Sequence, residues 1–274
     1  MNAGYHPIVT TWCSLALVFM TLMVAACSQQ PPEPLPNNTP IPPSNTSDAY
    51  DFPIKPGTDA WRAFNSHDEM LNACQIPEPL LKNMSTSGLV ETVMNYPLFG
   101  DILAYNNPQI GINRVSAQFN GLSELLKRKD AGTVLLNIYA AMDPAAIPDN
   151  WTDLQKGDYS FNFLYIETVL AQESILSTLT THELEELMEQ ANTKFQAQQN
   201  NSEVYDIYSM SMPIWVLSRV MLHIDYPPFK QEVSENEMLS TFTRDGTLHN
   251  VPSSVWDDIF YQTISISEQY LLEQ

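Results

Sequence analysis

Basic residues, cysteine and glycine are all scarce in this sequence of 274 residues. It has 12 Lys and Arg against 32 Asp and Glu, which gives a formal net charge of −20. A chain with this much negative charge repels phosphate backbones and anionic lipid headgroups. Neither nucleic-acid binding nor electrostatic docking to a membrane is therefore expected. The nine glycines stand singly and form no glycine-rich phosphate loop. A Gly-x-Ser-x-Gly nucleophile elbow is also missing from the sequence.

The three cysteines do not suggest a disulfide framework. Cys13 lies within an apolar N-terminal segment, Cys27 ends that segment, and Cys74 stands alone in the rest of the chain. Loss of Cys13 with the segment and modification of the Cys27 thiol would leave no pair for an intramolecular disulfide, even in an oxidising compartment. We expect Cys74 to be a small buried core residue rather than a nucleophile.

The apolar N-terminal segment is typical of an export signal. Its core, Leu15–Ala26, is short for a transmembrane helix, which needs roughly 20 residues, and fits the core of a signal peptide. The segment ends in Val24-Ala25-Ala26-Cys27, which resembles the lipobox of bacterial lipoproteins. The resemblance implies that residues 1–26 are cleaved off, that the Cys27 thiol takes a diacylglyceryl group, and that the new amine is acylated, for example with palmitate. The alternative is an uncleaved anchor over Ile8–Ala26; both place the remainder outside the cytoplasm.

Residues 27–58 are predicted to be a disordered tether that begins at the lipidated cysteine. The stretch contains nine prolines among Asn, Ser and Thr. Such a composition does not pack a core and favours an extended polyproline conformation. At roughly 3.1 Å per residue, the tether would reach on the order of 80–90 Å from the membrane.

Residues 59–274 are predicted to be mostly α, as an irregular helical bundle or as stacked helical hairpins. Capping boxes begin at Ser66 and Thr180, and apolar residues follow at helical spacing. A short β-hairpin is expected at residues 241–248, around Asp245-Gly246. The segment 145–158 is a candidate boundary between two subdomains. Further helices are expected after Ser85, from Pro108, after Asp130, over residues 159–179, from Pro213 to about His223, and from Ser253 to Phe260 or beyond.

A faint internal repeat joins two parts of this region. Residues of the first copy recur 95 positions later in the second, and both copies predict a helix, a Ser or Thr cap and another helix. A shared origin favours stacked hairpins; chance identity in helical sequence is the alternative. The matching residues are Glu78, Leu81, Thr86, Leu89 and Glu91 in the first copy, and Glu173, Leu176, Thr181, Leu184 and Glu186 in the second.

Residues 61–145 resemble a group of uncharacterised exported bacterial proteins. The resemblance implies export and a helical fold, and it carries no known activity. The residues that carry it are Cys74-Gln75-Ile76-Pro77-Glu78, Leu80 to Thr86 with Met84-Ser85-Thr86, Leu89-Val90, Tyr96-Pro97-Leu98, Tyr105-Asn106 and Asn120-Gly121.

Polar clusters give three candidate sites, each with a structural alternative. His182 and Glu186 share a helix face as in a zinc-protease motif, but the second histidine is missing and no third ligand is found; a solvated first turn is the alternative. Asp257 and Asp258 are adjacent, so they point to different faces and are poor partners for glycoside hydrolysis. The basic run 127–129 holds three of the twelve cations at an expected helix C-terminus, where the helix dipole favours cations.

An aromatic and methionine stretch is the best candidate for a ligand groove. Its members Tyr205, Tyr208, Met212 and Trp215 lie close together in the sequence, with Met210 among them. Packing of the same side chains in the core is the alternative.

The sequence favours a non-enzymatic, lipid-anchored helical module that binds a protein or a small ligand at the bacterial cell envelope. No cofactor and no metal are expected. A cell-envelope hydrolase or wall-modifying enzyme with an unrecognised site is the alternative. A solute-binding component of a transporter is a third hypothesis, although such proteins usually have two α/β lobes.

Overall fold

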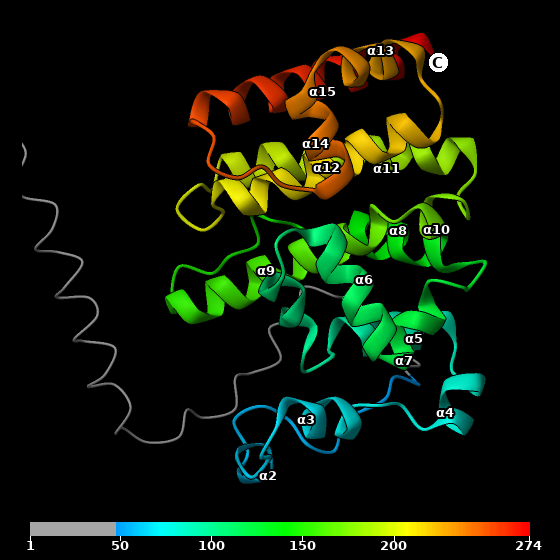
Figure 1. Ribbon diagram of the computed structural model, residues 1–274, viewed down its shortest axis with the longest axis vertical. Helices are drawn as coiled ribbons and strands as arrows, with labels where there is room; N and C mark the ends of the chain where they lie inside the picture. Colours follow the sequence, from blue (N-terminus) through cyan, green and yellow to red (C-terminus); the bar gives the residue numbers. More distant parts are fainter. Residues whose placement is uncertain (1–47) are drawn as a thin grey trace, which may run out of the picture. The chain divides into compact units, whose positions relative to one another are not determined.

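The computed structural model describes residues 48–274, and within this range every regular element is a helix (Figure 1). The predicted mostly-α class is confirmed. Cys27, the signal segment and residues 27–47 of the predicted tether lie outside the described residues. The helices are α2 (Asp59–Arg62), α3 (His67–Ala73), α4 (Glu78–Asn83), α5 (Thr86–Met94), η2 (Phe99–Ala104), α6 (Pro108–Gln118), α7 (Asn120–Leu125), α8 (Ala131–Ala141), α9 (Asp153–Leu170), α10 (Glu173–Leu176), α11 (Thr181–Gln199), α12 (Ile207–His223), α13 (Pro227–Glu235), α14 (Glu237–Asp245) and α15 (Ser253–Glu273).

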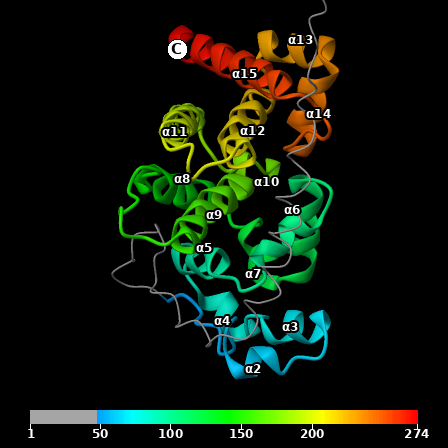
Figure 2. The same cartoon turned by 90° about the vertical axis from the view of Figure 1, so that its left-hand side faces the viewer.

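The helices of residues 48–274 are stacked in layers that follow the order of the chain. In both ribbon views α2 and α3 lie at one end, and α13 and α15 lie at the other (Figures 1 and 2). Helix α12 is the central element, since it packs against α9, α10, α11, α13, α14 and α15. Its residues from Ser211 to Ser218 are all buried. Within the described part of the chain, no helix combines the length and the hydropathy that a membrane span requires.

Helix starts were the most predictable feature of the sequence. The Ser85 hydroxyl accepts the Gly88 N–H at 3.0 Å at the start of α5. Thr180 and Glu183 form the reciprocal bonds of a capping box at the start of α11. The predicted stripe of α11 is buried throughout, which confirms that this face packs into the core. The stripe consists of Leu184, Leu187, Met188, Ala191 and Phe195.

The prediction of a β-hairpin at residues 241–248 is wrong, because residues 241–245 belong to α14 and residues 246–248 form no strand. The Asn236 side chain accepts the N–H groups of Met238 and Leu239 and so starts a helix. Leu239 and Phe242 then face the core one turn apart. Gly246, at φ 79°, ends α14 in the left-handed conformation. Asp-Gly therefore terminates a helix here instead of turning a hairpin.

Two predicted helix bounds also differ from the structure. Pro213 lies within α12 rather than at its start, because the helix begins at Ile207 after the Asp206 cap. The long helix expected over 159–179 starts earlier and ends at Leu170, after which the short α10 follows. The sequence Thr152-x-x-Gln155 makes the capping box that starts this helix.

The last part of the predicted tether is packed on the helices. Phe52 is 3% exposed and lies in the hydrophobic core. Residues 48–52 also bond to α5 and its cap through Asp48 and Tyr50. The prediction of a free tether up to residue 58 is therefore wrong for these residues, because an aromatic side chain that finds a core site is withdrawn from water.

Candidate functional site

Three of the four residues predicted to line a ligand groove lie in the interior. Tyr205, Met212 and Trp215 are each 0% exposed, and Tyr208 is half-buried. The indole N–H of Trp215 donates to the carbonyl oxygen of Thr243 at 3.0 Å. Enclosed side chains cannot line an open groove, so the alternative of core packing describes these three residues.

The two acidic candidate clusters are dispersed on the surface. The His182 side chain is 89% exposed, and its Nδ1 lies 3.8 Å from Glu185 rather than beside Glu186. Asp257 and Asp258 are both exposed on α15. Among residues 48–274, no group of three or more His, Cys, Asp and Glu side chains is placed to hold a metal ion.

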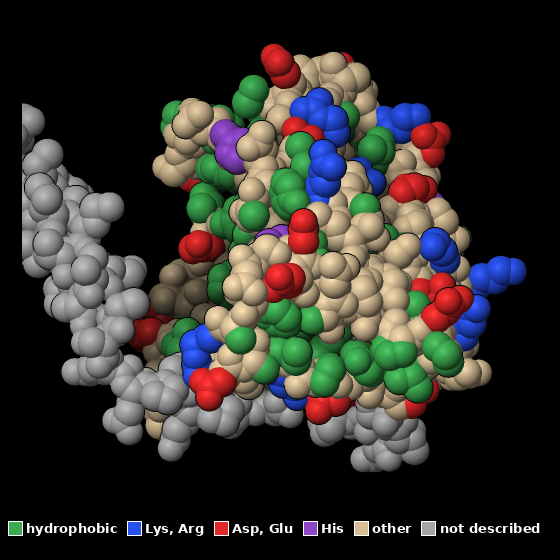
Figure 3. Space-filling model, turned by 60° about the horizontal axis from the view of Figure 1, so that its bottom comes forward, with side chains coloured by type: hydrophobic (Ala, Val, Ile, Leu, Met, Phe, Trp, Pro, Cys, Tyr) green, Lys and Arg blue, Asp and Glu red, His purple; other side chains and the backbone are tan. Residues whose placement is uncertain are grey.

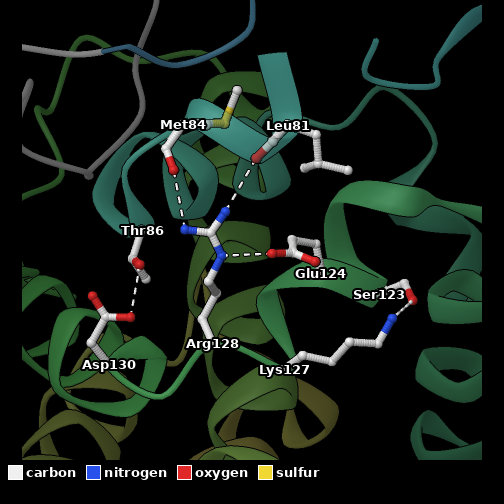
Figure 4. Close-up of polar contacts among 8 residues, drawn as sticks. All are labelled: Leu81, Met84, Thr86, Ser123, Glu124, Lys127, Arg128 and Asp130. Carbon is white, nitrogen blue, oxygen red and sulfur yellow. Dashed lines mark hydrogen bonds and ion pairs between the residues drawn. The ribbon is translucent and has the colours of Figure 1, made fainter. Parts of the chain in front are cut away.

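The basic run follows α7, and its central residue is bonded within the protein (Figure 4). The Arg128 guanidinium donates to the carbonyl oxygens of Leu81 and Met84, at 3.1 Å each. Its Nε also lies 2.8 Å from Glu124 Oε1. Since Leu81 and Met84 lie at the end of α4, Arg128 satisfies carbonyl groups that have no partner inside that helix. Its role is to hold α4 against α7.

The two lysines that flank Arg128 remain on the surface. Lys127 points away from Arg128 and donates to the Ser123 hydroxyl at 3.0 Å (Figure 4). Lys129 is exposed. Asp130 occupies the cap position of α8 but accepts a hydrogen bond from the Thr86 hydroxyl at 2.8 Å, so it joins α8 to α5 instead of capping α8.

An open hollow of about 370 Å³ lies between α4 and α7, beside the basic run. Its size is within the range of small-ligand pockets, roughly 300–1,000 Å³, but its lining is mostly polar and charged. Such a surface suits a polar contact better than an apolar ligand. The lining residues are Glu78, Leu81, Lys82, Asn120, Ser123, Glu124 and Lys127.

The charges around this hollow are mixed, in contrast to the acidic chain as a whole. Lys82 Nζ lies 2.6 Å from Glu78 Oε1. The hydrogen bond from Lys82 lowers the pKa of Glu78, and the same bond raises the pKa of Lys82. Lys82 and Lys127 thus face the same hollow as the carboxylates of Glu78 and Glu124. In the view that brings the α2–α4 end forward, a band of hydrophobic side chains also reaches the surface (Figure 3).

No family model matches this sequence, and comparisons with curated proteins and with solved structures found no match either. The likeness of residues 61–145 to exported bacterial proteins therefore stays a prediction from the sequence.

A buried polar cluster, which the sequence analysis missed, joins α8, α9 and α11. Glu167 is 0% exposed, and its Oε1 accepts the Tyr139 hydroxyl at 2.8 Å, while its Oε2 has no protein partner. Lys194 is 4% exposed, and its Nζ lies 3.3 Å both from the carbonyl oxygen of Ala140 and from Gln190 Oε1. An acidic residue inside the apolar run of α9 was the available sequence signal.

Burial controls the protonation of this cluster. It raises the pKa of Glu167 well above its usual value, against the opposing effects of the Tyr139 hydrogen bond and the Lys194 charge. It also lowers the pKa of Lys194. Removal from water disfavours the charged form of both groups.

Proposed function

We propose that this chain is a lipid-anchored helical module that binds a partner at the bacterial cell envelope. The observation that carries the proposal is the sequence Val24-Ala25-Ala26-Cys27 at the end of an apolar segment. A proline-rich stretch of the length needed to hold a domain away from the headgroups follows it. Several acyl chains anchor a protein stably, whereas one chain binds only marginally.

The hollow between α4 and α7 is the surface that we assign to the partner. Its lining residues are mostly polar or charged, and two of them are lysines, Lys82 and Lys127, in a protein of net charge −20. Cations on an otherwise acidic surface attract an anionic group on the partner. The acidic surface around them repels that group, which fixes the orientation in which the partner binds.

The anchor is tested by Cys27→Ala, with Cys13→Ala as the matched control. Cells that express each variant are labelled with an alkyne fatty acid and then separated into membrane and soluble fractions. We expect Cys27→Ala to lose the label and the processed size, and Cys13→Ala to keep both. Processing to the same size with continued labelling of Cys27→Ala would exclude the lipid anchor.

The partner surface is tested by photo-crosslinking in intact cells. A benzophenone amino acid replaces Ser123, which lines the hollow, or Gln231, which lies on α13. We expect one adduct of defined mass at Ser123 that Lys127→Glu weakens, and no such adduct at Gln231. An adduct of equal yield at both positions, or at neither, would refute the assignment of this surface.

A further inference from the structure

Residues 48–52, which we call the strap, run without helical structure beside α5. The Asp48 carboxylate accepts the Ser85 N–H at 2.7 Å and the Ser85 hydroxyl at 2.6 Å. These bonds lower the pKa of Asp48, because they favour its charged form. The Ser85 hydroxyl in turn accepts the Gly88 N–H. The strap therefore places a carboxylate at the start of α5, where the helix dipole favours negative charge.

Gly88 provides the space that Asp48 occupies. A Cβ atom at Gly88 would lie 1.9 Å from Asp48 Oδ1 and 3.1 Å from the Ala49 nitrogen. Any side chain there would therefore displace the carboxylate. Glycine destabilises a helix interior by roughly 0.5–1 kcal/mol relative to alanine, so its presence here matches the need for close approach.

Two further contacts continue along the same helix face. The Tyr50 N–H donates to the Thr92 hydroxyl at 2.8 Å, and Thr92 is 0% exposed. Phe52 fills a socket formed by Tyr96 and Phe119, with ring centroids 6.0 and 6.1 Å away. Asp48 and Phe52 thus contact the body through their side chains, and Tyr50 contacts it through its backbone N–H.

The strap is joined to the rest of the chain by a polar, exposed connection. Residues 55–58 are all exposed, and neither α2 nor α3 contains a fully buried residue. Hydrogen bonds of Asp48 and Tyr50 and the buried Phe52 side chain attach the strap to the body. Segments outside the helices that adjoin an exposed connection open locally at a lower free energy than the core.

We propose that the groove along α5 and beside Phe119 is a peptide-binding site for a segment with the pattern Asp-x-x-x-Phe, and that the chain's own residues 48–52 occupy it reversibly. The groove offers two donors for a carboxylate, a hydroxyl acceptor for a backbone N–H and an aromatic socket, in the order in which residues 48, 50 and 52 present those groups. None of the residues that contact the strap lines the α4–α7 hollow, and the site does not depend on the lipid anchor.

The test uses the full chain, purified in detergent, with its own strap opened by Asp48→Ala and Phe52→Ala together. A fluorescent peptide with the sequence of residues 48–54 is titrated and followed by anisotropy. We expect the peptide to bind the opened variant and to bind the unmodified chain about tenfold or more weakly, because the strap competes at high effective concentration. A peptide that lacks the aspartate, or one that lacks the phenylalanine, should also bind about tenfold or more weakly.

Two glycine substitutions in the opened variant provide the matched control. Gly88→Ala should abolish peptide binding, whereas Gly157→Ala should leave it unchanged, since a Cβ at Gly157 meets no atom within 4 Å. Absence of binding by a folded opened variant would overturn the proposal. Loss of the helical circular dichroism signal on opening would overturn it too, because the strap would then be part of the core.

Hydrogen exchange tests the opening of the strap in the unmodified chain. The Tyr50 amide should exchange faster than the α5 amides, and equal rates would count against the proposal.

Discussion

Replacement of Glu167 by glutamine should make the protein more stable at neutral pH. The side chain is 0% exposed and burial raises its pKa, so the folded state favours the protonated carboxyl. Above its ordinary pKa of 4.5, the unfolded state releases that proton. Folding then takes up a proton, so the stabilising contribution is fully present below pH 4.5 and is lost as the pH rises through the folded pKa. Glutamine is neutral at every pH and removes this dependence.

The size of the effect follows from the single proton that Glu167 takes up on folding. Above the ordinary carboxyl pKa, the free energy of unfolding of the unmodified protein should fall with pH by up to about 1.4 kcal/mol per pH unit. The free energy of unfolding of Glu167→Gln should not show this fall. Glutamine keeps an oxygen that accepts the Tyr139 hydroxyl. Glu167→Leu removes that acceptor and leaves a buried hydroxyl unpaired, which should cost about 1–3 kcal/mol.

Urea unfolding, followed by circular dichroism from about pH 3 to about pH 8, measures the difference between the two proteins on both sides of the ordinary carboxyl pKa. Glu183→Gln provides a control of opposite sign. Hydrogen bonds from Thr133 and from Thr180 lower the pKa of Glu183. Its stabilising contribution is therefore present above pH 4.5 and is lost as the pH falls. A difference for Glu167→Gln that stays constant over the whole range would refute the reasoning, since the buried carboxyl would then be ionised in both states.

Three further substitutions test the packing. Leu187→Ala, at a fully buried position of α11, should lower the free energy of unfolding by about 2–4 kcal/mol, whereas Glu189→Ala on the exposed side should cost under about 0.5 kcal/mol; equal losses in urea unfolding would refute the facing of α11. Gly246→Ala should lower the thermal midpoint measurably, because φ is 79° there and a Cβ would lie 2.8 Å from the buried indole of α12; an unchanged midpoint would contradict this. Arg128→Met should destabilise the protein by about 1–3 kcal/mol, because carbonyls of α4 lose their donor, while Lys129→Met should have little effect; the same urea titration decides.

The parts of the fold that could be predicted from sequence are those set by local chemistry. A serine or threonine before an apolar stripe marks a helix start wherever its side chain can bond the third backbone N–H, as at Ser85 and Thr180. The hairpin prediction failed because Asp-Gly serves both as a hairpin turn and as a helix end. Only the spacing of Leu239 and Phe242, together with the Asn236 cap, distinguishes the two.

The features that could not be predicted depend on contacts between distant parts of the chain. Phe52 lies in a proline-rich segment, and nothing in its neighbours indicates a socket formed by Tyr96 and Phe119. Aromatic residues such as Tyr205 and Trp215 are common both in binding grooves and in protein cores. Only their burial in the folded protein shows that they belong to the core. Periodicity along a chain reports which residues share a face but does not report what covers that face.

Cys74 gives the lipid question a chemical readout. Its thiol is 0% exposed, and burial raises its pKa to about 11, so it is protected from thiol reagents while the protein is folded. In denaturant every free thiol reacts, and the sequence contains three cysteines. A chain that has been cleaved before Cys27 and alkylated on its sulfur would release only the Cys74 thiol, whereas an uncleaved and unmodified chain would release all three. The number of thiols that react in unfolded protein therefore reports whether the N-terminus has been processed, and the Cys74 thiol, present in either form, is the internal standard.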